Sequence, residues 1–152
     1  MNIHLHVVFS TKERRPLIGN AWRSRLHEYL GGCVRTLGGV AVEVGGVSDH
    51  VHALLSVRPV HRLSDMMRDV KTASSLWVHD EIHEPEFGWQ DGYAAFSVSR
   101  SGVEAVRRYI RNQEAHHRRR SFDEELEALL RAHGIAIDPR IPRRGRGAET
   151  PS

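Results

Sequence analysis

Cysteine is almost absent from this sequence, since Cys33 is the only one among 152 residues. One chain therefore cannot form a disulfide framework or a zinc site built from several thiolates. Long apolar runs are also missing, because no stretch approaches the roughly 20 residues that a membrane-spanning helix requires. No secretory signal is recognisable either. We therefore expect a cytoplasmic protein with no membrane partner.

Charge is moderate and slightly basic, with 22 Lys and Arg against 19 Asp and Glu, for a net charge of +3. Such a balance permits nucleic-acid binding without requiring it. The composition, 39% hydrophobic and 27% charged, is typical of a globular chain that can bury a core. Histidine is plentiful, with 11 residues. Because histidine is the commonest metal ligand, this abundance favours a metal site.

A glycine-containing turn followed by a strand holds the most informative histidines. Alternation over residues 50–57 predicts a strand with apolar residues on one face and with His50, His52 and Leu54 on the other. Neighbouring positions on one strand face are about 7 Å apart, so two imidazoles can converge on one ion. Asp49 directly precedes the pair. The spacing indicates half of a divalent-metal site, but it leaves open two histidines on a half-exposed strand.

A second pair, His4 and His6, lies in the strand predicted over residues 2–9. This pair lacks the acidic neighbour and the glycine turn of the first. We expect it to be mainly the exposed face of a strand, and we leave open that His6 reaches the metal site. The roles of His116 and His117 are open as well.

The predicted elements alternate in the order β-α-β-β-α-β. Strands are expected over 2–9, 40–44, 50–57 and 93–99, and helices over 20–37, 63–79, 101–117 and 122–133. Asn20 is expected to cap the first helix, and Ser101 with Glu104 is expected to form a capping box. The order predicts an α+β, ferredoxin-like antiparallel sheet with helices on one face, followed by a C-terminal helix that carries Tyr109.

The chain is predicted to hold one folded domain over residues 1–137. Pro, Gly and Arg dominate residues 138–152, so we expect a basic, disordered tail there. Within the domain, basic residues cluster at three places, and we expect them to bind nucleic acid. They are Lys12, Arg14, Arg15, Lys71, Arg107, Arg108 and Arg111.

Three stretches together resemble the small single-tyrosine HUH transposases of bacterial insertion sequences, the IS200-like transposases. They are His-Val-His at 50–52, Tyr-Ala-Ala-Phe-Ser-Val-Ser at 93–99 and Tyr-Ile-Arg-Asn-Gln-Glu-Ala-His-His at 109–117. Residues 8–12 and 71–75 also look like that family. The resemblance covers roughly residues 3–137. A histidine pair alone would be weak evidence, but the pair and the tyrosine helix in this order are specific.

The resemblance implies a function and a set of site residues. His50 and His52 would hold Mg²⁺ or Mn²⁺, Gln113 would be a third metal ligand, and Tyr109 would be the nucleophile. The implied enzyme is a metal-dependent transposase that cleaves and rejoins single-stranded DNA at hairpin-marked element ends through a covalent 5′-phosphotyrosine. The family also implies a homodimer with shared active sites, in which the tyrosine helix of one subunit completes the site of the other.

The chemistry of these residues fits the implied reaction. Tyrosine has a pKa near 10 and needs help to act as a nucleophile at neutral pH. A metal held by imidazoles can polarise a phosphate, and a two-histidine site favours Mn²⁺ over Mg²⁺. Two alternatives stay open: a related tyrosine nuclease acting on dispersed palindromic repeats, and a non-catalytic module that only binds a DNA hairpin. The presence of Tyr109 argues against the second. Taken alone, however, Tyr109 is typical of a helix residue at the edge of the core.

Overall fold

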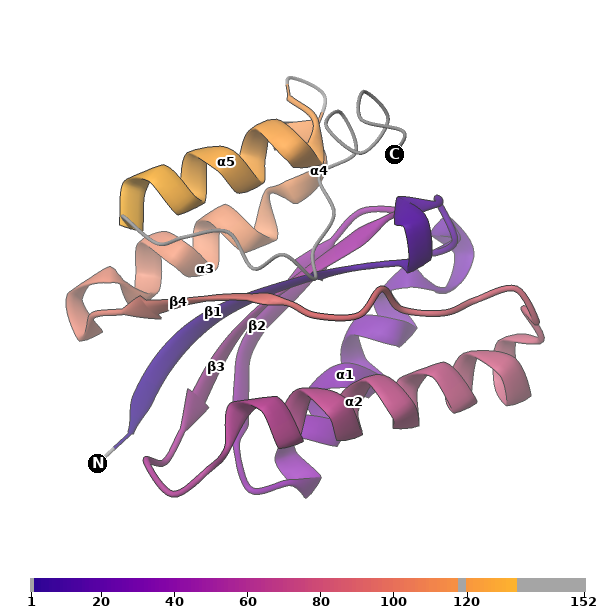
Figure 1. Cartoon of the computed structure of the whole chain (residues 1–152), viewed down its shortest axis with the longest axis horizontal. Coiled ribbons are helices and arrows are strands. Elements are labelled where there is room, and N and C mark those ends of the chain that lie inside the picture. The colour runs from indigo at the N-terminus through magenta and orange to yellow at the C-terminus, as the bar shows by residue number, and fades with distance from the viewer. Residues whose placement is uncertain (1, 118–119, 134–152) are drawn as a thin grey trace, which may run out of the picture.

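The computed structural model describes residues 2–117 and 120–133 and contains one antiparallel sheet (Figure 1). The strands follow the order β2-β3-β1-β4, with every neighbouring pair antiparallel. They are β1 (Ile3–Ser10), β2 (Val40–Gly46), β3 (His50–Val57) and β4 (Ala94–Val98). This is the ferredoxin-like arrangement, so the predicted fold class is confirmed.

Two helices cover one face of the sheet, and the C-terminal helices lie on the other (Figure 1). The first face carries α1 (Arg23–Thr36) and α2 (Leu63–Trp77). The C-terminal helices are α3 (Val103–Arg111), α4 (Gln113–His117) and α5 (Phe122–His133). The predicted tyrosine-bearing helix is therefore present, and it lies on the face opposite α1 and α2.

The central strands are buried on both sides, and their alternation separates two environments. On the α1 and α2 side, Val7, Phe9 and Leu55 belong to the large apolar core. On the other side, Val8 joins a smaller apolar cluster to which α5 contributes Phe122. The register pairs Val8 with His52 and Ser10 with His50. The two central strands therefore present their polar side chains to the C-terminal helices.

Several predicted helix boundaries are wrong. Asn20 does not cap α1, because residues Asn20–Trp22 form a 3₁₀ turn and α1 begins at Arg23 without a side-chain cap. The expected box at Ser101 also does not form, since α3 begins after Gly102 without a side-chain cap. The single helix predicted up to residue 117 is interrupted at Asn112, which separates α3 from α4.

A capping box is present instead at the start of α5. The Ser121 backbone N–H donates to Glu124 Oε1 over 2.8 Å, and the Glu124 backbone N–H donates to Ser121 Oγ over 3.2 Å. These reciprocal bonds satisfy backbone donors that a helix N-terminus leaves unpaired. The start of α5 is therefore specified locally, and the bounds predicted for this helix are confirmed.

Three other elements shift by a few residues. The second strand extends through Gly46, which leaves a shorter hairpin turn than the one predicted over 45–49. The fourth strand covers Ala94–Val98. Helix α2 ends at Trp77 and is followed by a π-helical turn over Val78–Ile82.

A Cβ at Gly45 would lie 2.5 Å from the carbonyl oxygen of Ile110. Glycine at this position therefore allows α3 to approach β2 closely.

The predicted basic tail at 138–152 lies outside the described residues. In the part of the chain that the structure describes, none of the helices has the length and apolar character needed to cross a bilayer.

Candidate metal and tyrosine site

The paired histidines of β3 lie under the C-terminal helices rather than on an open strand face. The side chains of His50 and His52 are both fully buried. Their Nε2 atoms lie 3.2 Å and 3.1 Å from the same carboxylate oxygen, Glu125 Oε1. The strand alternation thus places the two imidazoles as predicted, and they converge on one point. The half-exposed strand that the spacing had left open is excluded.

The carboxylate at this point belongs to Glu125 on α5, a residue that the sequence analysis did not select. Its side chain is fully buried. The ligand atoms of His50, His52 and Glu125 all lie within 4.8 Å of one another, a group that could hold a metal ion. His117 Nε2 also lies 2.8 Å from Glu125 Oε1. Imidazole nitrogens and a carboxylate oxygen are the usual protein ligands of divalent transition metals.

Gln113, the predicted third ligand, lies at the same place and is buried. Its Oε1 is 3.3 Å from His50 Nε2. Its amide Nε2 donates to Glu125 Oε2 over 3.0 Å and lies 3.4 Å from the carbonyl oxygen of Tyr109. The side chain therefore bridges one histidine and the carboxylate.

Tyr109 reaches the cluster from α3. Its hydroxyl donates a hydrogen bond to Glu125 Oε2. The ring centroid lies 5.7 Å from that of His52 and 6.1 Å from that of His6. The family resemblance implies that this tyrosine meets the histidines of a partner subunit. In the structure, the tyrosine and the histidines come from one chain.

A second set of contacts holds the histidines in place. His6 Nε2 lies 2.8 Å from His52 Nδ1, and Asp49 Oδ1 lies 2.8 Å from His50 Nδ1. Such partners fix the orientation of a ligating imidazole and leave the other nitrogen for the ion. His6 is buried. The expectation that the His4–His6 pair is mainly an exposed face is therefore wrong for His6, which reaches the site.

Burial and charge act differently on the three imidazoles. Burial is the main cause that lowers the pKa of His52 to about 4. Burial, and then the neighbouring His52, lower the pKa of His6 to about 3. For His50, burial alone would lower the pKa, but hydrogen bonds with Asp49 and Glu125 outweigh it and raise the pKa above its usual value. His52 and His6 are thus neutral near pH 7, and a neutral imidazole is the form that binds metal.

The acidic groups of the site are shifted in opposite directions. Burial alone would raise the pKa of the Glu125 carboxyl, but hydrogen bonds with His117, His50 and His52 outweigh it and lower the pKa well below its usual range. Burial, and then the charge of Glu125, raise the pKa of the Tyr109 phenol above its ordinary value. The resting site therefore holds an ionised carboxylate beside a protonated phenol.

A cavity of about 340 Å³ adjoins the cluster at the turn between β2 and β3. Its wall includes Ser48 and Asp49 from the turn, His117 from α4, Arg120 from the segment before α5, and Arg14. Arg14 was predicted to bind nucleic acid, but its side chain is buried and forms an ion pair with Asp123. In this structure the Arg14 guanidinium therefore anchors the start of α5.

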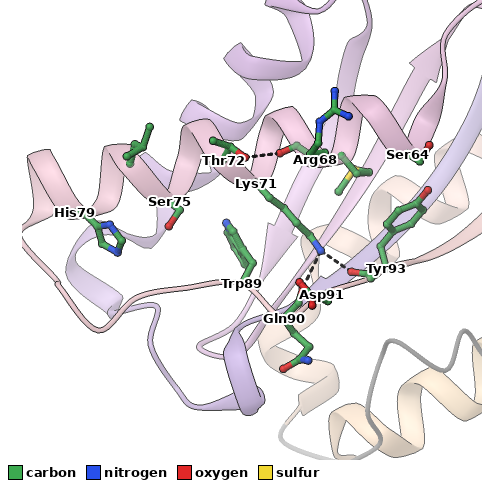
Figure 2. Close-up of a pocket in the computed structure, with 13 residues that line it drawn as sticks. Ser64, Arg68, Lys71, Thr72, Ser75, His79, Trp89, Gln90, Asp91 and Tyr93 are labelled. Carbon is green, nitrogen blue, oxygen red and sulfur yellow. Dashed lines mark hydrogen bonds between the residues drawn. The ribbon is translucent and has the colours of Figure 1, made fainter.

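The other predicted nucleic-acid residues divide into three groups. Lys71 is committed to the protein, since its ammonium donates to the carbonyl oxygens of Gln90 and Gly92 over 2.8 Å and 2.6 Å (Figure 2). It lies in a separate cavity of about 660 Å³ between α2 and the segment before β4. Arg107 and Arg111 lie 3.4 Å and 3.0 Å from Glu43 Oε1.

The third group consists of Lys12, Arg15 and Arg108, which are exposed to solvent, as is Arg111 of the second group. Lys12 and Arg15 follow β1 at the end of the sheet where the β2–β3 turn lies, and the Thr11 backbone N–H donates to the Asp49 carbonyl oxygen over 2.9 Å. The Lys12 backbone N–H donates to the Gly88 carbonyl oxygen over 2.9 Å, and Arg15 Nη2 lies 3.2 Å from Glu86 Oε1, so both residues lie beside the loop over 84–88.

The sequence carries one signal by which Glu125 could have been found. On α5, Glu125 lies three residues after Phe122 and directly before Leu126, so it falls within the apolar stripe of the helix. Both of those side chains are buried. A carboxylate on a buried stripe requires a partner, because an isolated buried charge is strongly unfavourable. An acidic residue in this position therefore indicates a cation or an ion pair.

Comparison with known proteins gives one family and two related folds. A family model described as Transposase IS200 like matches residues 1–113. Among solved structures, the chain is similar to a protein of Deinococcus radiodurans R1 assigned as a transposase, with 24% identity and a TM-score of 0.59 over 74% of this chain and 92% of that one. It is also similar to the REP-associated tyrosine transposase bound to a REP hairpin, with 12% identity and a TM-score of 0.58 over 76% and 68% of the respective chains. No curated protein matches the sequence.

Proposed function

The chain belongs to the family of IS200-like transposases, and from this we propose that it cleaves and rejoins single-stranded DNA in a metal-dependent reaction with Tyr109 as the nucleophile. The observation that carries this proposal is the hydrogen bond from the Tyr109 hydroxyl to Glu125, whose other oxygen faces His50 and His52. A nucleophile and a metal-binding cluster thus share one carboxylate. We place this reaction in the cytoplasm.

The residues present suit a divalent ion such as Mn²⁺ or Mg²⁺. His50 and His52 would hold it through nitrogen, and the oxygens of Gln113 and Glu125 are close enough to complete the set. When bound, such an ion polarises the scissile phosphate and stabilises the charge that develops on it. Two imidazoles among the donors favour Mn²⁺, because Mg²⁺ prefers oxygen ligands.

The chain itself supplies the nucleophile and the groups that position it. The Tyr109 oxygen attacks the phosphorus of a phosphodiester, the bond from phosphorus to the 3′ oxygen breaks, and a 5′-phosphotyrosine and a free 3′ hydroxyl result. The phenol gives up its proton and the leaving oxygen gains one, so the step is balanced. Attack by a 3′ hydroxyl on the phosphotyrosine reverses it. Because the bond energy is kept, the DNA is rejoined without another source of energy.

We propose a DNA hairpin as the recognised substrate feature. The similar REP-associated tyrosine transposase was solved with a hairpin bound. In this chain, Lys12, Arg15, Arg108 and Arg111 are exposed and can contact phosphates, with Arg15 and Arg111 exchanging their surface ion pairs with Glu86 and Glu43 for the DNA backbone. Since Arg14 and Lys71 are engaged within the protein, we do not assign them to the DNA surface.

We further propose that a single chain is a complete catalytic unit. The metal-binding cluster and Tyr109 meet without any contribution from a partner. The homodimer with exchanged tyrosine helices remains a prediction from the family resemblance. Mixing two inactive variants decides between these arrangements, as set out in the Discussion.

The similarity to the REP-associated enzyme also favours one alternative, a tyrosine nuclease that acts on dispersed palindromic repeats. Both candidates perform the same chemistry and differ in the DNA that they recognise. Cleavage at hairpins that flank copies of this gene supports the transposase, whereas cleavage only at repeats scattered elsewhere supports the nuclease.

The proposal is tested by incubating the protein with labelled single-stranded DNA from the flanking locus and added Mn²⁺. We expect a covalent protein–DNA adduct that survives denaturation. Duplex DNA of the same sequence, and a sample with EDTA, are expected to yield none. An adduct that forms equally well in EDTA contradicts the metal dependence, and the absence of any adduct contradicts the enzymatic role.

A further inference from the structure

The buried carboxylate of Glu125 contacts more side chains than one ion pair would need. Its Oε1 lies 3.2, 3.1 and 2.8 Å from the Nε2 atoms of His50, His52 and His117. Its Oε2 accepts hydrogen bonds from the Tyr109 hydroxyl and from the Gln113 amide. We propose that Glu125 is the third protein ligand of the metal ion and that Gln113 orients this carboxylate instead of binding the ion. This inference rests on the proposed function.

The direction of the two Glu125 oxygens supports this assignment. Oε1 faces the nitrogens that a metal would share, and Oε2 faces the amide and the phenol. Gln113 approaches only one of the paired histidines, with its oxygen 3.3 Å from His50 Nε2, while its N–H donor points to the carboxylate. An amide that donates to a ligating carboxylate has the usual geometry of a residue that holds a ligand in place.

The charge of the site points the same way. Glu125 is fully buried, and its ion-pair partners within the described residues are histidines, with no lysine or arginine among them. A buried carboxylate needs a compensating positive charge. Histidine differs from lysine and arginine in that it can exchange a proton for a metal ion. The surroundings of Glu125 are therefore those of a metal ligand and not those of a permanent salt bridge.

This arrangement gives Glu125 a second role toward the nucleophile. Because Oε2 accepts the Tyr109 hydroxyl, the carboxylate that binds the ion also positions the attacking oxygen next to it. Helix α5 then becomes part of the active site. Its placement depends on the apolar contacts of Phe122 and Leu126 and on the ion pair between Arg14 and Asp123. The ligand set is two histidines and one carboxylate, which suits transition metals such as Mn²⁺ better than Mg²⁺.

The test measures Mn²⁺ binding to the full-length protein without DNA, by electron paramagnetic resonance of the free ion. Glu125→Gln is expected to weaken Mn²⁺ binding by at least about 100-fold, because a charged ligand is lost. Gln113→Ala is expected to weaken it by about 10-fold, the effect of losing an orienting partner. Glu127→Gln, a matched change on the same helix, is expected to bind Mn²⁺ as the wild type does. Thermal unfolding of each variant checks that the fold is retained.

Two results would overturn the assignment. One is wild-type Mn²⁺ affinity in Glu125→Gln, and the other is a larger loss in Gln113→Ala than in Glu125→Gln. Should Glu125→Gln fail to fold, Glu125→Asp is measured in its place. That variant keeps the charge but withdraws the oxygen by one methylene, so a loss of about 10-fold supports the assignment, and unchanged affinity overturns it.

The measurement separates this inference from the proposed function. Tyr109→Phe is expected to bind Mn²⁺ like the wild type while forming no DNA adduct. If the wild type binds Mn²⁺ through Glu125 and yet never cleaves DNA, the metal site stands and the transposase proposal fails. If DNA is cleaved with Mn²⁺ and Glu125→Gln still binds the ion normally, the proposed function stands and the role of Glu125 is wrong.

Discussion

The two faces of the sheet use the same alternating strands for different purposes. On the side of α1 and α2, Phe9 and Leu55 of the central strands pack into a continuous apolar core. On the other side, the neighbouring positions are taken by His6, His50 and His52, which lie among polar side chains of α3, α4 and α5. Burial of apolar side chains on the first face stabilises the fold. The second buries polar groups that contribute little stability and carry the candidate chemistry.

This difference explains why the polar face is so highly connected. A buried polar group without a hydrogen-bond partner is costly, so most polar side chains of this face are hydrogen-bonded to one another, with the Ser10 hydroxyl as an exception. His6 contacts His52, Asp49 contacts His50, and Glu125 contacts five side chains. A smaller apolar cluster, which includes Phe96 and Leu126, holds α5 over this network.

Replacing Tyr109 with phenylalanine removes the candidate nucleophile and leaves its ring in place. The covalent protein–DNA adduct is expected to disappear completely, because no hydroxyl remains to attack the phosphate. Hairpin affinity is expected to stay within about twofold, since affinity comes mainly from phosphate contacts. The adduct is measured on a denaturing gel and the affinity by electrophoretic mobility shift. Tyr93→Phe is the control, and any residual adduct in Tyr109→Phe would contradict the assignment.

Alanine at His50 or His52 tests the proposed metal site on the same face. DNA cleavage is expected to fall by at least about 10³-fold, because charge on the phosphate is no longer stabilised. Hairpin binding is expected to change little. His4→Ala, on the same sheet but away from the cluster, serves as the matched control in the Mn²⁺-dependent cleavage assay. Normal cleavage by both variants in Mn²⁺ would show that the pair does not hold the catalytic ion.

Leu55→Ala probes the apolar face. We expect it to lower the free energy of unfolding by about 2 to 5 kcal/mol, the usual effect of truncating a fully buried leucine. At temperatures where the variant stays folded, Mn²⁺ affinity is expected to equal that of the wild type. Denaturant titration measures the first quantity and paramagnetic resonance the second. A variant with wild-type free energy of unfolding but weaker Mn²⁺ binding would contradict the assignment of stability to this face and of metal binding to the other.

The smallest expected effect comes from mixing two inactive chains. Tyr109→Phe protein is co-refolded with the His50→Ala, His52→Ala double variant, and cleavage is measured after hetero-oligomer formation has been assessed with two affinity tags. If each chain carries its own complete site, no cleavage returns. If helices are exchanged between subunits, as the family resemblance implies, a mixed dimer has one intact site and cleavage is restored.

Local patterns in the sequence were sufficient for much of this architecture. Alternation assigned Val51 and Leu55 to one face and His50 and His52 to the other, and the order of the elements predicted the ferredoxin-like sheet. Each of these features depends on residues close together in the chain. The family resemblance also placed Tyr109 and Gln113 with the paired histidines, but on one continuous helix that completes the site of a partner subunit. In the structure the two residues lie on α3 and α4, and both are close to the histidines of their own chain.

Features that depend on distant contacts were not predicted. Glu125 lies 75 residues from His50 along the chain, and its role depends on how α5 packs across the sheet. The burial of His6 has the same cause. The positions of basic residues in the sequence did not identify the DNA-binding surface. Sequence alone does not distinguish a basic residue that contacts DNA from one that, like Arg14 and Lys71, bonds to groups of its own chain.

The measurement that tests the central claim most directly is identification of the residue to which DNA becomes attached. The chain has three tyrosines. Tyr29 stacks on Trp77 on the apolar side of the sheet, Tyr93 lines the cavity beside α2, and Tyr109 contacts Glu125 of the histidine and glutamate cluster. After cleavage in Mn²⁺, nuclease and protease digestion followed by mass spectrometry should find the nucleotide on the peptide that contains Tyr109. A nucleotide on Tyr29 or Tyr93 would place the chemistry elsewhere and contradict this account.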